Sequence, residues 1–472
     1  MVFNSFDFVV FFAVVTPLYF LLPHRFRWAL LLAASCFFYM FFIPVYIVIL
    51  GVTVVIDYVA AIAIENTHDP KRKRALLSLS ILSLCATLFV FKYFNFFNEN
   101  AVKLAEMIGW NYPIEALAIA LPIGLSFHTF QGLSYVIEVY RGKQKAERHF
   151  GIYSLYVMYF PQLVAGPIER PQNVLHQFHA PQRFDLGRFG DGMLLVVWGL
   201  FKKVVVADSL ALYVDTVYNS NTHHSGTTLL VATYFFAFQI YCDFSAYSDM
   251  ARGLSRVYGV ELMKNFETPY FSSSISEFWT RWHISLSTWF RDYVYIPLGG
   301  NRVSTGRFIR NIFIVFMLSG FWHGANWTFM IWGALHAAYL VGERFLKAGA
   351  ARVSLAERVP TWLLQAVGVA LTFNLTVLAW VFFRAADVST AFSILGRIAT
   401  EPGPLFSDPI LAQGMFGIAA VLGLDLFHRF ADFWNRRESY SLAFRFAYAL
   451  TLLFGVVLLG VEHGTQFIYF QF

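Results

Sequence analysis

The residues from Asn311 to Gly342 read NIFIVFMLSGFWHGANWTFMIWGALHAAYLVG and include no Asp, Glu, Lys or Arg. Roughly 20 apolar residues cross a bilayer core, so this stretch is long enough to lie within a membrane. His323 lies near its middle. An ionisable side chain at that depth is costly unless it faces a partner or a cavity, so it marks a candidate functional site. A neutral imidazole is also an effective general base near neutral pH.

The composition of the whole chain is also that of a membrane protein. Of the 472 residues, 58% are hydrophobic and 14% are charged, whereas soluble domains carry about 25% charged residues. We therefore expect an all-α, polytopic integral membrane protein, a single domain over 1–472, with about eleven transmembrane helices. Besides 311–342, the uncharged or nearly uncharged runs are 8–23, 28–56 with a turn near Pro44, 75–91, 116–137, 151–168, 191–201, 227–242, 359–383, 409–424 and 446–461.

The basic residues of the chain cluster in short loops between these runs. Lys71 to Arg74 and Arg141 to Arg148 lie in alternate connections. The positive-inside rule places such loops in the cytoplasm and the N-terminus outside. The net charge of +6 is thus explained without a nucleic-acid partner. The three cysteines are not spaced as metal ligands, and we expect no metal.

The stretch 243–310 is polar and rich in aromatic residues, although it lies between apolar runs. Polar backbone at membrane depth persists only where it is buried in protein or lines a cavity. Glu277 and Arg281 are spaced to pair on one helical face, and His283 and Ser287 have the same spacing. We expect short, partly re-entrant helices here that form the wall of a central funnel reaching His323.

Three ordered motifs resemble those of the membrane-bound O-acyltransferase family. They are EFWTRWHISLS at 277–287, PLGGNR at 297–302 and FWHGAN at 321–326. The segments PQLVAGPI at 161–168 and FIYFQF at 467–472 extend the likeness over nearly the whole chain. Within the family, the chain is most similar to the bacterial branch that acetylates exopolysaccharides such as alginate.

This resemblance implies an O-acetyltransferase of the bacterial inner membrane. His323 matches the family's catalytic histidine, and His283 matches a second family position whose role is less defined. The implied donor is cytoplasmic acetyl-CoA, and the implied final acceptor is an exopolysaccharide such as alginate or cellulose. Periplasmic partner proteins are expected to complete the transfer. Asn326, Trp322 or backbone N–H groups are candidates for stabilising the oxyanion.

Two other functions remain open at this point. One is transfer of D-alanine from a carrier-protein thioester to teichoic acid. The other is transport of a polymer or lipid precursor, which also needs a polar funnel among many spans. Coupled transporters usually carry acidic residues within their spans, and the long apolar runs of this chain contain none.

Several further polar residues have a structural interpretation. We expect His336, thirteen residues after His323, to face another side of the same helix. Asp243 and Asp249 either line a donor passage or pair with Arg252, and pairing is favoured. Lys202 and Lys203 either contact CoA phosphates or extend from a helix end toward water, and the second explanation is favoured.

Overall fold

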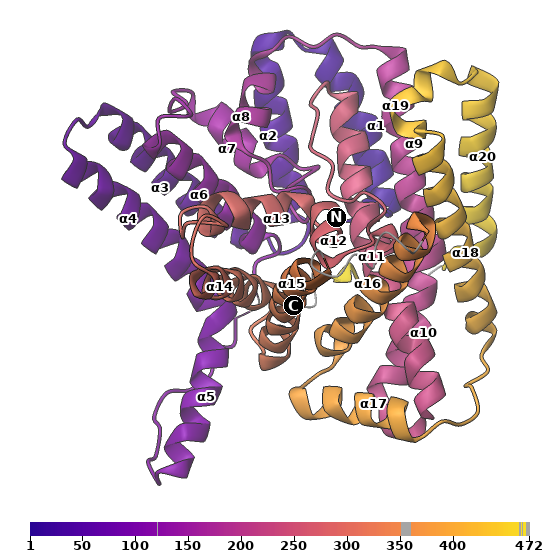
Figure 1. Ribbon diagram of the computed structural model, residues 1–472. Coiled ribbons are helices and arrows are strands. Elements are labelled where there is room, and N and C mark those ends of the chain that lie inside the picture. The colour runs from indigo at the N-terminus through magenta and orange to yellow at the C-terminus, as the bar shows by residue number, and fades with distance from the viewer. Residues whose placement is uncertain (120, 351–359, 462–463, 465, 469–472) are drawn as a thin grey trace. The chain divides into compact units, whose positions relative to one another are not determined.

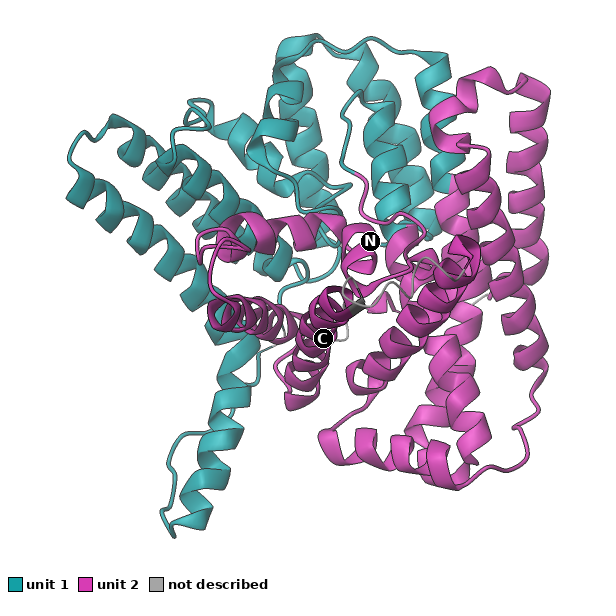
Figure 2. Ribbon diagram, viewed as in Figure 1, with its two compact units in different colours: residues 1–196, 247–263 teal, residues 197–246, 264–472 magenta. Residues whose placement is uncertain are grey.

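The computed structural model describes residues 1–472 except 120, 351–359, 462–463, 465 and 469–472. Its described residues form helices and loops and contain no strand, which confirms the all-α prediction (Figure 1). The chain divides into two compact units, drawn in Figure 2. Unit 1 comprises 1–196 and 247–263, and unit 2 comprises 197–246 and 264–472.

Unit 1 contains the N-terminal helices. Helix α4 illustrates why they begin where they do: Asp69 accepts hydrogen bonds from the Lys71 and Arg72 N–H groups, and Pro70 occupies the first turn. The helices that lie wholly within unit 1 are α1 (Phe6–Leu21), α2 (His24–Met40), α3 (Tyr46–Asn66), α4 (Pro70–Leu88), the π-helix η1 (Phe89–Tyr93), α5 (Phe94–Met107), α6 (Leu125–Tyr140), α7 (Phe150–Met158), α8 (Pro171–Val174) and the 3-10 helix η2 (Leu175–His179).

A polar contact joins three helices in the interior of unit 1. Ser80 on α4 donates a hydrogen bond of 2.9 Å to the buried Asp57 carboxylate on α3. Gly132 on α6 lies against the same carboxylate, since a Cβ there would be 2.2 Å from Asp57 Oδ2. The absence of a side chain at Gly132 therefore allows α3, α4 and α6 to pack closely.

Two helices have residues in both units, namely α9 (Leu186–Leu200) and α11 (Gly226–Val257). The remaining helices belong to unit 2. They are the π-helices η3 (Phe201–Ala207) and η6 (Arg291–Tyr295), the 3-10 helices η4 (Asn221–His223), η5 (Pro269–Phe271) and η8 (Arg437–Ser439), and α10 (Asp208–Asn219), α12 (Ile275–Arg281), α13 (Ile284–Phe290), α14 (Thr305–His323), α15 (Trp327–Ala350), α16 (Thr361–Arg384), α17 (Val388–Thr400), α18 (Pro409–Phe430), α19 (Phe433–Arg436) and α20 (Leu442–Leu459).

Within the described residues, six helical segments are long and apolar enough to cross a membrane. The other apolar runs form helices that are shorter or more polar, so the structure supports a membrane protein without reproducing the predicted number of about eleven crossings. The run 28–56 divides near Pro44 into α2 and α3, as the sequence predicted. The six segments are Tyr46–Asn66, Pro70–Met107, Gly226–Val257, Thr361–Arg384, Pro409–Phe430 and Leu442–Leu459.

The run 311–342 differs from its predicted form. Helix α14 ends at His323, and α15 begins at Trp327 after a connection of three residues, 324–326. Gly324 makes this turn possible, because a Cβ there would lie 2.1 Å from the ring of Phe329. So short a connection returns the chain along α14, and the run is a helical hairpin with His323 at its bend.

Candidate active site

The two histidines singled out by the sequence lie close together in unit 2. Their ring centroids are 6.3 Å apart, although they belong to different helical segments. His323 is the last residue of α14 and is 3% exposed, and His283 precedes α13 and is 0% exposed. Packing therefore brings both imidazoles into one buried centre.

Three aromatic rings pack against the imidazole of His323. Trp332 on α15 meets it edge-on at 5.0 Å, and Phe383 on α16 meets it at 5.3 Å. The ring of Trp322, its neighbour along the chain, is 5.0 Å away. Such a frame restricts rotation of the imidazole and shields it from water, and both effects favour a defined geometry for proton transfer.

His283 has an unusual backbone conformation. Its φ of 43° lies in the left-handed region, which residues other than glycine rarely adopt. Asn265 fixes this turn: its carbonyl accepts the Ile284 N–H at 2.9 Å, and its side-chain oxygen accepts both the N–H and the hydroxyl of Ser285. Phe244 packs edge-on against the His283 ring at 4.6 Å. A strained residue held by several neighbours is typical of a functional site.

Sequence reasoning missed Asn265. The residue is 1% exposed, and its surroundings Lys264-Asn265-Phe266 contain no signal that distinguishes it from an ordinary loop asparagine. Its role depends on the fold, since its partners lie about 20 residues further along the chain. Many polar loop residues could form hydrogen bonds of this kind, so only the structure identifies Asn265 as the residue that does.

The short helices predicted within 243–310 are present in its second half. They are α12, α13 and η6, and the Glu277–Arg281 ion pair forms on α12 as the spacing predicted. The first part of the stretch instead continues the long helix α11. The Ser287 hydroxyl donates to the Trp282 carbonyl at 3.1 Å and so forms a local turn contact next to His283.

A cavity of about 550 Å³ lies among α12, α13, η6, α14 and α15. Its wall is mostly apolar and includes Trp279. Ser287 and Ser319 also line it, and they are four residues from His283 and His323 respectively. Neither histidine itself lines the cavity, which thus reaches to about one helical turn from each. The apolar lining residues are Leu286, Phe290, Phe308, Ile312, Val315, Phe316 and Leu340.

Charged residues also line this cavity. Arg291 and Lys347 are exposed, so they mark where the cavity opens, and Arg344 lies near them with its guanidinium 4.0 Å from the ring centroid of Phe308. Glu343 pairs with Lys347 and accepts hydrogen bonds from Ser276. A largely apolar cavity with a cationic opening suits a ligand that has an apolar or uncharged arm and an anionic end.

Two predicted details of the site are wrong. His336 is not on the same helix as His323, because the helix breaks at 324–326 and His336 lies on α15. The ring of His336 lies 4.9 Å from that of Trp332, which itself packs on His323. Lys202 and Lys203 do not extend toward water. They are 2% and 6% exposed, and Lys203 forms ion pairs with Asp208 and Asp243.

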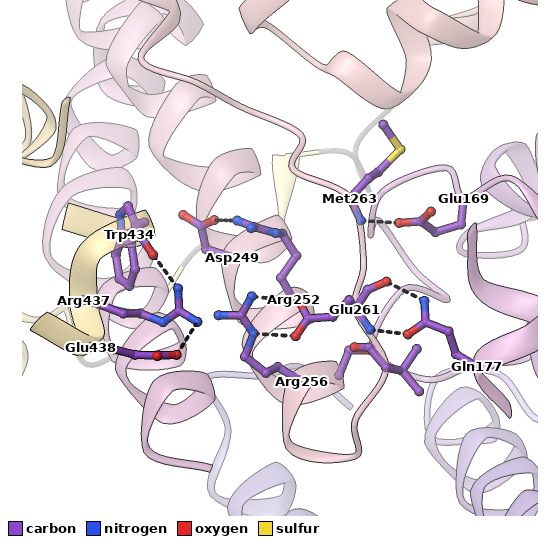
Figure 3. Close-up of polar contacts among 12 residues, drawn as sticks. Glu169, Gln177, Asp249, Arg252, Arg256, Glu261, Met263, Trp434, Arg437 and Glu438 are labelled. Atoms are coloured by element: carbon purple, nitrogen blue, oxygen red, sulfur yellow. Dashed lines mark hydrogen bonds and ion pairs between the residues drawn. The ribbon is translucent and has the colours of Figure 1, made fainter. Parts of the chain in front are cut away.

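The predicted pairing with Arg252 is confirmed for Asp249 and wrong for Asp243. Asp249 forms the ion pair with Arg252, at 3.2 Å, whereas Asp243 pairs with Lys203. Asp243 is wrongly predicted because its partner lies on another helix, η3. Figure 3 shows the Asp249–Arg252 pair on α11 and, beyond it, the pair between Arg256 and Glu261.

A buried carboxylate lies near these arginines in unit 1. Glu169 accepts the Met263 N–H (Figure 3) and a hydrogen bond from the Asn173 side chain. Burial raises the pKa of Glu169 to about 7, although these hydrogen bonds oppose the shift. The loop at 167–170 is thereby tied to the segment that follows α11.

Of the candidates for stabilising the oxyanion, Asn326 uses its side chain in hydrogen bonds to the backbone. Its amide nitrogen donates to the Ala386 carbonyl at 3.0 Å, and its side-chain oxygen accepts the Thr328 N–H at the start of α15. Both contacts fix the bend of the α14–α15 hairpin. Asn326 therefore helps to fix the connection that directly follows His323.

The sequence profile of the membrane-bound O-acyltransferase family matches residues 149–384. This range includes both histidines, the cavity and the α14–α15 hairpin. The chain belongs to this family. It is an acyltransferase, as the family description and the names of its O-acetylase and O-acetyltransferase relatives indicate.

Bacterial relatives extend the match beyond the profile. A probable alginate O-acetylase, AlgI, of Azotobacter vinelandii is 39% identical over 88% of this chain and 81% of its own length. A peptidoglycan O-acetyltransferase of Helicobacter pylori is 34% identical over 86% of this chain and 77% of its own. A teichoic acid D-alanyltransferase of Streptococcus thermophilus is 26% identical over 55% of this chain and 68% of its own.

Proposed function

We propose that this chain takes an acetyl group from cytoplasmic acetyl-CoA and moves it through the bacterial inner membrane for O-acetylation of an exopolysaccharide such as alginate or cellulose. The observation that carries this proposal is the meeting of His283 and His323 next to the cavity with a cationic opening. The two O-acetylating relatives match a larger share of the chain than the D-alanyltransferase does.

The cavity supports a CoA thioester as the donor. Its apolar wall suits the uncharged arm that carries the thioester, and Arg291, Arg344 and Lys347 offer positive charge to the phosphates at the other end. Ser287 and Ser319 lie at the side of the cavity nearest the histidines along their helices. A thioester bound in this direction presents its carbonyl toward the centre.

In the proposed reaction, His323 acts as the general base. Its imidazole accepts the proton of an acceptor hydroxyl while the hydroxyl oxygen attacks the thioester carbonyl. The tetrahedral intermediate collapses, the carbon–sulfur bond breaks, and the imidazolium returns its proton to the leaving thiolate. The products are an acetyl ester and free thiol, so neither an oxidant nor a metal is required. His283 lies beside the general base, with its ring centroid 6.3 Å from that of His323.

Replacement of His323 by alanine tests the proposal. We expect His323→Ala to lower the acetyl content of the polymer by about 10²- to 10⁴-fold, the usual contribution of a general base, while membrane insertion is unchanged. The measurement is polymer acetylation in a strain that lacks the chromosomal gene and carries the variant. Thr288→Ala is the control, since Thr288 bonds only to carbonyls of its own helix. Normal acetylation in the His323 variant would remove this residue from the mechanism.

A further inference from the structure

A cluster of ionisable side chains is buried in unit 2 away from the cavity. Lys203 lies 2.8 Å from both Asp208 Oδ1 and Asp243 Oδ1, and all three residues are almost fully buried. Lys203 belongs to the π-helix η3, and π-helical turns are often found at functional sites. Buried charges inside a membrane protein are expensive and usually mark a function, yet the proposed acetyl transfer uses none of these three.

Asp243 also binds a segment from the far end of the sequence. Its second carboxylate oxygen accepts the Ile468 N–H at 2.6 Å. A second contact lies nearby, where the Val461 N–H donates to the carbonyl of Val204, the residue after Lys203. The chain that follows α20 is thus attached at two points, and one of them depends on the Lys203–Asp243 pair.

The next residue on α11 connects this attachment to the site. Phe244 packs edge-on against the imidazole of His283 at 4.6 Å, and its ring centroid lies 6.0 Å from that of Phe467. Asp243 holds Ile468, and the ring of Phe244 contacts both Phe467 and His283. A shift of the 467–468 segment therefore removes one side of the packing that fixes Phe244 and, through it, His283.

We propose that Asp243 is a positioning residue of the acetyl-transfer centre: with Lys203 as its counter-ion, it holds Phe467–Ile468 on α11 and so fixes Phe244 against His283. This inference rests on the proposed function of the two histidines. It assigns Asp208 a lesser part, because the carboxylate that accepts the Ile468 N–H is that of Asp243 and a single carboxylate is enough to pair Lys203.

Two pairs of variants test the inference. Ile468→Pro removes the N–H that Asp243 accepts, whereas Ile468→Ala keeps it. Asp243→Asn weakens the contact with the Ile468 N–H. Asp208→Asn keeps the Asp243 carboxylate, which still pairs Lys203 and accepts the Ile468 N–H. Each variant is assayed in inverted membrane vesicles with labelled acetyl-CoA, and the rate at which label leaves CoA for the vesicle interior gives kcat and KM.

We expect Ile468→Pro and Asp243→Asn to lower kcat by about tenfold to a hundredfold, since misplacement by about 1 Å has effects of this size. The KM for acetyl-CoA is expected to stay unchanged, because the cavity is lined by residues of other helices. Ile468→Ala and Asp208→Asn are expected to keep the parental kcat. Parental kcat in Ile468→Pro would overturn the inference, and so would a loss of kcat of equal size in Ile468→Ala.

A spin label reports the position of the segment independently of activity. Gln466 is exposed, and a nitroxide attached to Gln466→Cys, with Cys36 and Cys85 replaced by alanine, senses the motion of the neighbouring residues. We expect increased label mobility in Ile468→Pro and Asp243→Asn but not in the two controls. Unchanged mobility in both test variants would contradict the proposed attachment, even if Asp243→Asn proved inactive through misfolding.

The two proposals fail in distinguishable ways. Full transfer by His323→Ala in the same vesicles would overturn the proposed function, whereas the label in Gln466→Cys would still report whether Asp243 holds the segment. Loss of transfer in His323→Ala together with normal kcat in Ile468→Pro would leave the proposed function in place and overturn the positioning role of Asp243.

Discussion

At the scale of single residues, His283 and His323 owe their chemistry to their surroundings. Both imidazoles are buried among aromatic rings. These rings restrict how each imidazole can turn and keep water away from it. The left-handed backbone of His283 adds a constraint, because the loop tolerates this conformation only while Asn265 holds it.

The role of His283 can be separated from its backbone conformation. His283→Asn retains a residue that adopts left-handed conformations with little strain but removes the imidazole. We expect the rate of acetyl transfer to fall by at least about tenfold, because a group that supports proton transfer is lost. The rate is measured in membrane vesicles with labelled acetyl-CoA.

Thr268→Asn is the matched control for this prediction, since Thr268 has a φ of 42° and lies outside the aromatic frame of the two histidines. Its transfer rate is expected to stay near that of the parent. Equal rates in His283→Asn and the parent would show that His283 only fills space.

At the scale of helices, the α14–α15 hairpin places His323. The two helices approach closely at two glycines. A Cβ at Gly320 would lie 2.2 Å from the carbonyl oxygen of Phe329, and a Cβ at Gly333 would lie 2.3 Å from that of Phe316. Small residues at such points allow helix backbones to pack tightly in membranes. The close approach brings Trp332 against His323.

Enlarging one of these glycines separates the helices. Gly333→Ala is expected to lower stability by about 1–3 kcal/mol, the usual cost of overpacking, and to reduce acetyl transfer by moving Trp332 away from His323. The measurements are the midpoint of thermal unfolding in detergent and the transfer rate.

Gly342→Ala on the same helix is the control, because no atom lies within 4 Å of the position of its Cβ. This variant is expected to be as stable as the parent or slightly more stable, since alanine favours helix. If Gly333→Ala behaved like Gly342→Ala, close packing of the hairpin would not position the site.

At the scale of the whole molecule, the described residues form helices joined by short connections, and six of the helical segments are long and apolar enough to cross a membrane. The described connections between helices extend over tens of residues at most. A specific site for a polysaccharide is concave and buries much of its ligand, and such connections offer little surface for one. We therefore propose a relay in which a periplasmic partner protein, rather than this chain, delivers the acetyl group to the polymer.

Reconstitution tests the relay. We expect the purified protein in liposomes to move label from external acetyl-CoA but to acetylate enclosed polysaccharide far more slowly than cells do, because the protein that binds the polymer is missing. Enclosing a periplasmic extract from the same strain together with the polysaccharide is expected to restore the rate, and an extract treated with protease is the control. Acetylation by the purified protein alone at the cellular rate would show that this chain binds the polymer itself.

Several features of this protein follow from local sequence. Hydropathy identifies the membrane-type runs, because burial in lipid acts on each segment by itself. The break near Pro44 and the Glu277–Arg281 pair depend on neighbours a few residues away. The motifs around His283 and His323 were enough to indicate the family, which the comparisons confirm.

Other features were decided only by tertiary packing. The bend at 324–326 turned one predicted run into a hairpin and carried His336 back to the ring that covers His323. Lys203 pairs with Asp243 on another helix, and Asp243 accepts a hydrogen bond from Ile468, which lies 225 residues further along the sequence. Asn265 and Ser285 meet in the same way. Hydropathy and helical periodicity extend over a few turns, whereas these contacts depend on which helix faces pack together, and that choice is made by the folded chain as a whole.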